Sequence, residues 1–299
     1  MYKTSTDWGI MRPGFEGCEI EPNPKERAAL PANTFSFSMP ETWRDTVWTI
    51  LNDKITDAVL SAFREAPPEY LVSDDLSWLD DLIEATSGEP SDTKALLATR
   101  LRKTYRYFRA GHATRTDDLT PFYKNGLRVL RPEEFHDKVR QLFLNGQHRG
   151  VSESKLESAI KEVGDEVREG RLYFAAQEDS LFNRRGSSGH YLIYGSEYLY
   201  CIAMRTADTV AAKKVLSGIG RPTMFVCDIP MSQIRDGTLE EFSGMMLEYL
   251  FAGLVDQIDT DVLSPWSGSA LSIREDVAPE NIVGHYHPER IFDPLWNAW

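Results

Sequence analysis

Several side chains in the last two-thirds of the sequence are of types that can do chemistry, among them His112, Thr114, Tyr191, Tyr194 and Glu275. A histidine and a threonine two residues apart can hydrogen-bond sugar hydroxyls or an amide. A tyrosine ring can stack on a planar ligand group. A fixed carboxylate can stabilise the positive charge that develops on a sugar carbon when a glycosidic bond breaks. These residues are the first candidates for a site.

The residue pattern predicts the elements that would position these side chains. Runs rich in aromatic and β-branched residues predict strands over residues 105–108, 172–175, 191–194, 224–229, 270–274 and 282–286. Helices are predicted over residues 132–145, 154–169, 196–206 and 239–252. Because residues three apart on a strand face opposite sides, we expect only one of Tyr191 and Tyr194 to line a cleft.

The first hundred residues predict a different organisation. Residues 1–37 are rich in Pro, Gly and Asn and predict an extended arm, and residues 38–103 predict three helices. The first helix carries an apolar stripe at four-residue steps, made of Val47, Leu51, Ile55, Val59 and Phe63. Regular βαβ alternation is missing, so we expect an α+β fold. Its two predicted domains are an N-terminal arm and helical region (1–103) and a sheet-containing domain (104–299).

Composition and charge limit the function classes. The net charge of −13 argues against a duplex-DNA binder, and the basic and aromatic strip at 101–109 is better explained as a helix-to-strand junction. Three cysteines without a C-x-x-C pair predict neither a disulfide framework nor a structural zinc site. His285 and His287 share a strand face but lack a third metal ligand, so no metal is expected. The sequence shows no signal peptide and no long apolar run, which predicts a cytoplasmic protein without membrane contact.

Four segments, taken in order, resemble the ADP-ribosyltransferase superfamily. Residues 108–115 (FRAGHATR) resemble that family's first strand with its His-x-Thr element, and residues 121–127 (PFYKNGL) resemble the short helix after it. Residues 189–199 (GHYLIYGSEYL) resemble the strand with the stacking tyrosine and the next helix start. Residues 270–282 (ALSIREDVAPENI) resemble the late strand and closing turn. The resemblance covers roughly residues 104–294 and implies an ADP-ribosyltransferase-like split β-sheet domain that uses NAD as a substrate.

The resemblance implies a role for each residue of the ligand site. His112 would bind the adenosine-side ribose, with Thr114 supporting it. Tyr191 or Tyr194 would stack on the nicotinamide ring. Arg109 would hold an oxygen of the diphosphate.

The catalytic carboxylate is the point at which this sequence departs from the family pattern. The family places a glutamate at the start of a late strand, where this chain has Ser-Gly-Ser at residues 267–269. Glu275, at the other end of that strand, is the first candidate for the catalytic residue. Glu248 and Glu197 are the reserves.

Several functions agree with these features. The resemblance implies transfer of ADP-ribose from NAD to a macromolecular acceptor, protein or nucleic acid. The family's habits add an intracellular toxin or phage-defence effector, with an inhibitor or antitoxin protein as a further partner. One alternative is an NAD glycohydrolase, and another is an RNA 2′-phosphotransferase, for which Arg184 and Arg185 are the nearest basic pair. The missing glutamate favours a last alternative, a non-catalytic interaction protein with a degenerate fold.

Overall fold

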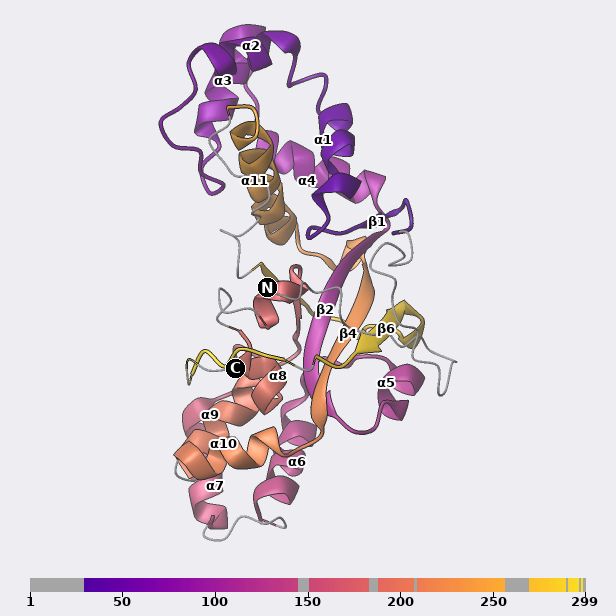
Figure 1. Ribbon diagram of the computed structural model, residues 1–299, viewed down its shortest axis with the longest axis vertical. Coiled ribbons are helices and arrows are strands. Elements are labelled where there is room, and N and C mark those ends of the chain that lie inside the picture. Colours follow the sequence, from indigo (N-terminus) through magenta and orange to yellow (C-terminus); the bar gives the residue numbers. More distant parts are fainter. Residues whose placement is uncertain are drawn as a thin grey trace. The chain divides into compact units, whose positions relative to one another are not determined.

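A computed structural model of the chain describes residues 30–144, 151–182, 188–206, 209–255, 269–288, 290–295 and 297 (Figure 1). Helices and a largely antiparallel sheet make the fold α+β, the class predicted from the sequence. Contacts divide the chain into two units. The described parts of residues 110–228 and 267–299 belong to unit 1, and those of residues 30–109 and 229–266 form unit 2. Unit 2 therefore contains the N-terminal helices and also the helix near residue 240, which the sequence analysis had placed in the other domain.

The helices of unit 2 are α1 (Arg44–Ile50), α2 (Asp57–Glu65), α3 (Ser77–Ser87), α4 (Thr93–Thr104) and α11 (Asp236–Ala252). The apolar stripe predicted to form one helix is split between α1 and α2, and this part of the prediction is wrong. The chain turns after α1, and the Thr56 hydroxyl then caps α2 by accepting a hydrogen bond of 3.4 Å from the Val59 amide. The stripe residues are nevertheless all buried, including Leu51 and Ile55, which lie between the two helices.

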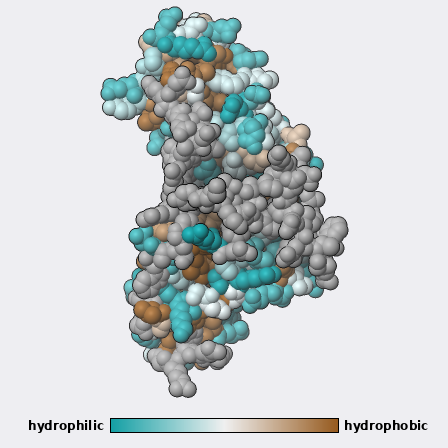
Figure 2. All heavy atoms as spheres, in the orientation of Figure 1, coloured by the Kyte–Doolittle hydropathy of each residue, from teal (hydrophilic) through white to brown (hydrophobic). Residues whose placement is uncertain are grey.

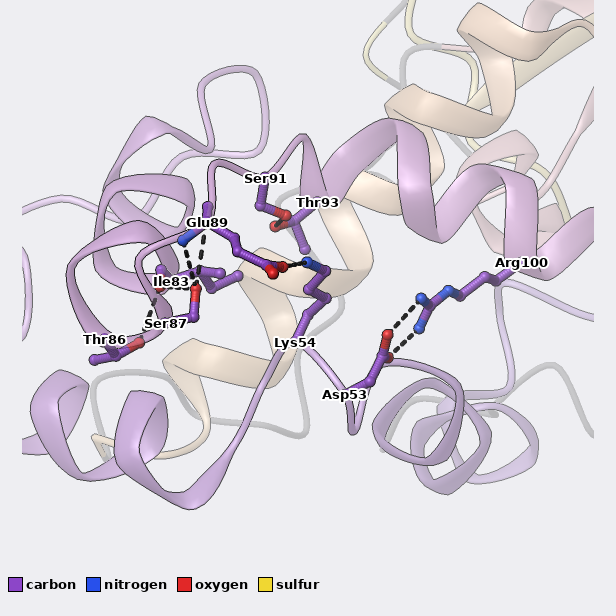
Figure 3. Close-up of polar contacts among 9 residues, drawn as sticks. All are labelled: Asp53, Lys54, Ile83, Thr86, Ser87, Glu89, Ser91, Thr93 and Arg100. Atoms are coloured by element: carbon purple, nitrogen blue, oxygen red, sulfur yellow. Dashed lines mark hydrogen bonds and ion pairs between the residues drawn. The ribbon is translucent and has the colours of Figure 1, made fainter.

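Aromatic packing and a few ion pairs hold unit 2 together. The Phe63 and Phe251 rings meet edge to face with centroids 4.8 Å apart, and both side chains are fully buried. Figure 3 shows Arg100 of α4 reaching Asp53 in the turn after α1, with one nitrogen–oxygen distance of 2.8 Å. The visible face of this unit mixes hydrophilic and hydrophobic residues (Figure 2).

The described strands form one sheet in the order β5-β3-β2-β4-β6. They are β1 (Thr34–Phe35, beside β2), β2 (Tyr107–Thr116), β3 (Leu172–Ala175), β4 (Arg221–Pro230), β5 (Ala270–Ile273) and β6 (Ile282–Tyr286). Figure 1 shows the long strands β2 and β4 side by side. The split sheet implied by the family resemblance is not present as two separate sheets. However, β3 meets β2 at a single residue pair, Gly111–Ala175, so the two parts of the sheet are only narrowly joined.

The helices of unit 1 are α5 (Thr120–Asn125), α6 (Pro132–Leu144), α7 (Glu153–Val163), α8 (His190–Tyr194), α9 (Glu197–Thr206) and α10 (Thr209–Ser217). Helices α7, α9 and α10 lie together in Figure 1 and share an apolar core. The strand predicted for residues 191–194 is wrong, because α8 occupies this position. Leu192 and Tyr194 are buried there, so packing overrides the strand preference of their sequence. Helix α10 was not predicted. Short 3₁₀ turns occur at Pro40–Thr42 (η2), Glu178–Leu181 (η3), Met231–Gln233 (η4) and Pro279–Asn281 (η6).

The end of α5 is fixed by a close backbone approach. Gly126 has a φ of 78°, and a Cβ atom there would lie 1.9 Å from the Val277 carbonyl oxygen. Leu127 and Val277 exchange two backbone hydrogen bonds, of 2.9 and 2.8 Å. Only glycine fits this position, so the segment after α5 is held against the chain that follows β5. No helix in the described ranges has both the length and the apolar character needed to cross a membrane.

Candidate functional site

Unit 1 contains a cavity of about 500 Å³ whose walls come from β2, α6, β3 and α8. This volume lies within the range of small-molecule sites. Four of the residues predicted from the sequence line it: His112, Thr114, Tyr191 and Tyr194. The two pairs are about 80 positions apart in the sequence, so the fold brings together residues that only the family resemblance had connected.

His112 is held in one tautomer by the neighbouring strand. Its Nδ1 atom lies 2.9 Å from the Tyr173 carbonyl oxygen, which can only accept a hydrogen bond. The Nδ1 position therefore carries the proton, and Nε2 is left as an acceptor. Burial lowers the pKa of His112, although the bond to Tyr173 acts in the opposite direction. A neutral ring with a free acceptor nitrogen is suited to a ligand hydroxyl.

The two tyrosines both line the cavity because α8 is a helix. Residues three apart on a helix share a face, so the expectation that only one would reach the cleft is wrong. Their environments differ. Tyr194 is 3% exposed, and its hydroxyl donates a 2.5 Å hydrogen bond to Asp293. Tyr191 is half-buried, and burial raises its pKa, so its ring is the accessible neutral surface for stacking.

The Arg115 guanidinium holds α8 and the turn between α10 and β4 together through four hydrogen bonds. Its Nε donates to the Ile219 carbonyl at 2.8 Å, and NH1 donates to the Leu192 carbonyl at 3.0 Å. Its NH2 group donates to the carbonyls of Ser217 and Gly220 at 2.6 and 2.7 Å. Burial lowers the pKa of this guanidinium. All four hydrogen-bond acceptors are neutral, so the positive charge of Arg115 contributes to the potential of the cavity.

The predicted acids lie outside the cavity wall. Because β5 ends at Ile273, Glu275 falls in the exposed turn after the strand and does not line the cavity. Glu197 on α9 pairs with Arg168 at 3.0 Å. Glu248 belongs to unit 2. Among the described lining residues, Glu134 on α6 is the one carboxylate, and the sequence analysis did not select it.

Arg109 is also not among the lining residues, and it belongs to unit 2. The cations that do line the cavity were missed: Arg115, Arg128, Arg131, Lys138 and Arg171. Two of them, Arg128 and Arg131, lie one and four residues after the Gly-Leu end of the second family-like segment. This position in the sequence could have identified them. Residues 267 and 268, where the family glutamate was sought, lie outside the described residues, as do Arg184 and Arg185.

Two other motifs have structural explanations. Arg102, in the basic and aromatic strip, donates to the Ile234 carbonyl at 2.6 Å and pairs with Asp236 at 2.7 Å, which supports the junction interpretation. His285 is 3% exposed and is hydrogen-bonded to the Tyr123 hydroxyl. Within the described part of the chain, no group of three or more His, Cys, Asp or Glu side chains could hold a metal ion.

Comparisons of the chain with protein-family models, with curated proteins and with solved structures find no match. The chemical argument therefore depends on the cavity itself. It offers an acceptor nitrogen and a hydroxyl on β2, an aromatic ring on α8 and several cations. This combination suits a ligand that contains a sugar, a planar ring and a negative charge.

Proposed function

We propose that this chain is an NAD-dependent ADP-ribosyltransferase whose ligand site is the cavity of unit 1. The observation that carries the proposal is the convergence of His112, Thr114, Tyr191 and Tyr194 on one cavity. His112 and Thr114 bind the adenosine-side ribose through hydrogen bonds, and Tyr191 stacks on the nicotinamide. Tyr194 fixes the cavity wall, since it is buried and hydrogen-bonded to Asp293.

Cleavage of the nicotinamide–ribose bond places positive charge on the ribose, and a carboxylate lowers the energy of that state. Glu275 is the candidate from the resemblance, and Glu134 is the carboxylate in the described wall. The acceptor is a protein or a nucleic acid, and an inhibitor protein is a further proposed partner. The cytoplasm is the proposed compartment, supported by the free thiol of Cys201.

One observation favours a second candidate, a protein that binds NAD without cleaving it. Glu134 is already paired with Arg128 at 2.9 Å, and the Glu134 side chain is 52% exposed at the rim of the cavity. A carboxylate in that position is poorly placed to act in a water-poor cleft.

The test begins with binding. A ligand that binds only the folded state stabilises it, by about 2.7 kcal/mol at a concentration of 100 times Kd. We expect NAD to raise the melting temperature of the wild type. Tyr191→Ala should weaken NAD binding about tenfold through lost stacking. Tyr70→Ala is the matched control, since Tyr70 is a 72% exposed tyrosine of unit 2.

Activity is then measured with radiolabelled NAD and a cell lysate divided into protein, RNA and DNA fractions. Label retained on one fraction, with nicotinamide released, would support transfer and identify the acceptor class. Loss of release in Glu275→Gln or Glu134→Gln alone would identify the carboxylate. Release without retained label would replace transfer by hydrolysis, and binding without release would favour the second candidate. If NAD neither binds nor is cleaved, the proposal is wrong.

A further inference from the structure

The charge of the cavity is opposite in sign to that of the chain. The whole sequence carries a net charge of −13. The described lining residues, however, include five cationic side chains and one carboxylate. A concave surface lined by one sign of charge concentrates ligands of the other sign. The cavity is therefore electrostatically suited to an anion.

Three cations of the cavity rim, Arg128, Arg131 and Arg171, project from backbone segments that are hydrogen-bonded to each other. Residues 128–131, between α5 and α6, pair with the chain before β3: the Leu130 amide donates to the Arg171 carbonyl at 3.0 Å, and the Gly170 amide donates to the Leu130 carbonyl at 2.9 Å. On the other side, Asp276 accepts a 2.8 Å hydrogen bond from the Val129 amide. These bonds fix the backbone from which the rim arginines project, so less backbone has to be ordered when a ligand binds.

A carboxylate oxygen already marks an anion position at this rim. The Oε1 atom of Glu134 lies 2.9 Å from a nitrogen of Arg128 and 3.5 Å from a nitrogen of Arg131. One anionic oxygen thus meets two guanidinium groups, and the Arg131 guanidinium also pairs with Asp276 at 3.1 Å. The three side chains are between 42% and 52% exposed, and ion pairs of this exposure contribute only about 0–1 kcal/mol. A phosphate group offers more charge and bidentate geometry to arginine, so it can replace the carboxylate.

Two more cations are available for a second phosphate. Arg171 and Lys138 line the same cavity, and Lys138 lies one helical turn after Glu134 on α6. Within the described residues, neither side-chain cation takes part in a hydrogen bond or an ion pair. The rim therefore has one occupied anion position and two cations without a counterion, as the binding of two linked phosphates requires.

We propose that Arg128, Arg131 and Arg171 bind the diphosphate of a nucleotide ligand, and that Glu134 occupies this anion position until the ligand displaces it. The identification of that nucleotide as NAD rests on the proposed function, whereas the anion position itself does not. Glu134 competes only with ligands that place an anionic group between Arg128 and Arg131, so phosphate-bearing ligands must displace it and nucleosides without phosphate do not interact with this position.

Isothermal titration calorimetry with three probes tests the inference. ADP-ribose carries the diphosphate but has no nicotinamide bond to cleave, pyrophosphate carries the charge alone, and adenosine has no phosphate. Glu134→Gln should tighten the binding of ADP-ribose and pyrophosphate about fivefold, because the competing charge is removed. Arg171→Gln should weaken both about tenfold. Adenosine binding should stay unchanged in both variants.

Two neighbouring residues provide matched controls. Glu133→Gln removes an exposed acid beside Glu134, and Arg140→Gln removes an arginine of the same helix that pairs with Glu157 at 2.7 Å. Neither control residue lines the cavity, so neither should change the affinities.

The outcomes separate the inference from the proposed function. If ADP-ribose binds with equal affinity to the wild type and both rim variants, or more weakly to Glu134→Gln, the inference is wrong while the NAD site stands. If pyrophosphate binding shifts as expected but ADP-ribose and NAD do not bind, the anion site stands and the proposed function fails. If neither ADP-ribose nor pyrophosphate binds, both are wrong.

Discussion

Replacement of Arg115 by methionine would show how the wall of the cavity is held. Methionine keeps the unbranched apolar stem but removes every donor. In the wild type the guanidinium donates to the carbonyls of Leu192, Ser217, Ile219 and Gly220. The variant therefore leaves four carbonyl groups without this donor, in α8 and in the turn between α10 and β4.

The cost of this change follows from the burial of each bond. The bonds to Leu192, Ile219 and Gly220 are part-buried, and the bond to Ser217 is exposed. A hydrogen bond from a charged donor contributes about 1.5 kcal/mol at the low end of its range, so three such bonds, with the exposed one neglected, give a loss of about 4.5 kcal/mol. The loss should appear as local opening of α8 and the α10–β4 turn.

Hydrogen exchange measured by mass spectrometry reports this opening directly. A loss of about 4.5 kcal/mol corresponds to roughly two-thousandfold faster exchange of the protected amides in these two segments. Amides of α4, in unit 2, provide an internal reference and should keep their rates. Arg140→Met is the matched control, because Arg140 is an arginine that pairs only with exposed carboxylates. An increase below tenfold at α8 would refute the reasoning that Arg115 holds this wall.

Two further predictions concern stability. Tyr194→Phe keeps the ring but removes the hydrogen bond to Asp293, so it should lower the free energy of unfolding by about 2 kcal/mol. A thermal melt measures this, with Tyr200→Phe as the control. Equal melting temperatures for Tyr194→Phe and the wild type would contradict the prediction. Burial lowers the pKa of His285 from 6.5 to about 4. As the pH falls, His285 is therefore protonated in the unfolded chain before it is protonated in the folded chain. The contribution of His285 to stability is therefore complete above about pH 6.5 and decreases as the pH falls toward 4, by about 2 kcal/mol between pH 7 and pH 5. Urea unfolding at both pH values measures this, and a His285→Gln variant with the same pH dependence as the wild type would show that the cause lies elsewhere.

The sequence predicted those elements whose local pattern agrees with their tertiary environment. Strand β3 was predicted with its observed bounds, and α6 to within one residue. Helix α7 was predicted to continue to residue 169, but it ends at Val163. The next residue, Gly164, has a φ of 65°, which stops the helix there. Periodicity alone does not reveal such an end.

The failures occurred where packing decided against local preference. The sequence of residues 191–194 is rich in aromatic and β-branched residues, yet Gly189 and Gly195 flank a five-residue helix there. In unit 2, the stripe from Val47 to Phe63 keeps its four-residue spacing although the helix is interrupted between Ile50 and Asp57. Both errors came from reading a burial pattern as one continuous element, because the pattern does not show where the backbone turns.

The candidate site was predicted only in part. His112 and Tyr191 were found because short motifs carry them, and both line the cavity. The carboxylate and the cations at the rim depend on tertiary placement: Glu134 and Arg171 come from elements that meet only in the folded chain. A charged residue on a helix surface looks the same in sequence whether it faces solvent or a ligand cavity.

For the proposed NAD site, the hydrogen bond between His112 and Tyr173 has a consequence for discrimination between dinucleotides. Since Nδ1 must donate to the Tyr173 carbonyl, the remaining ring nitrogen presents a lone pair. A lone pair attracts a hydroxyl and repels a phosphate or carbonyl oxygen. A dinucleotide whose ribose carries a 2′-phosphate would meet this lone pair with another acceptor. In the proposed NAD site, the Tyr173 carbonyl of β3 would thereby favour the dinucleotide without a 2′-phosphate.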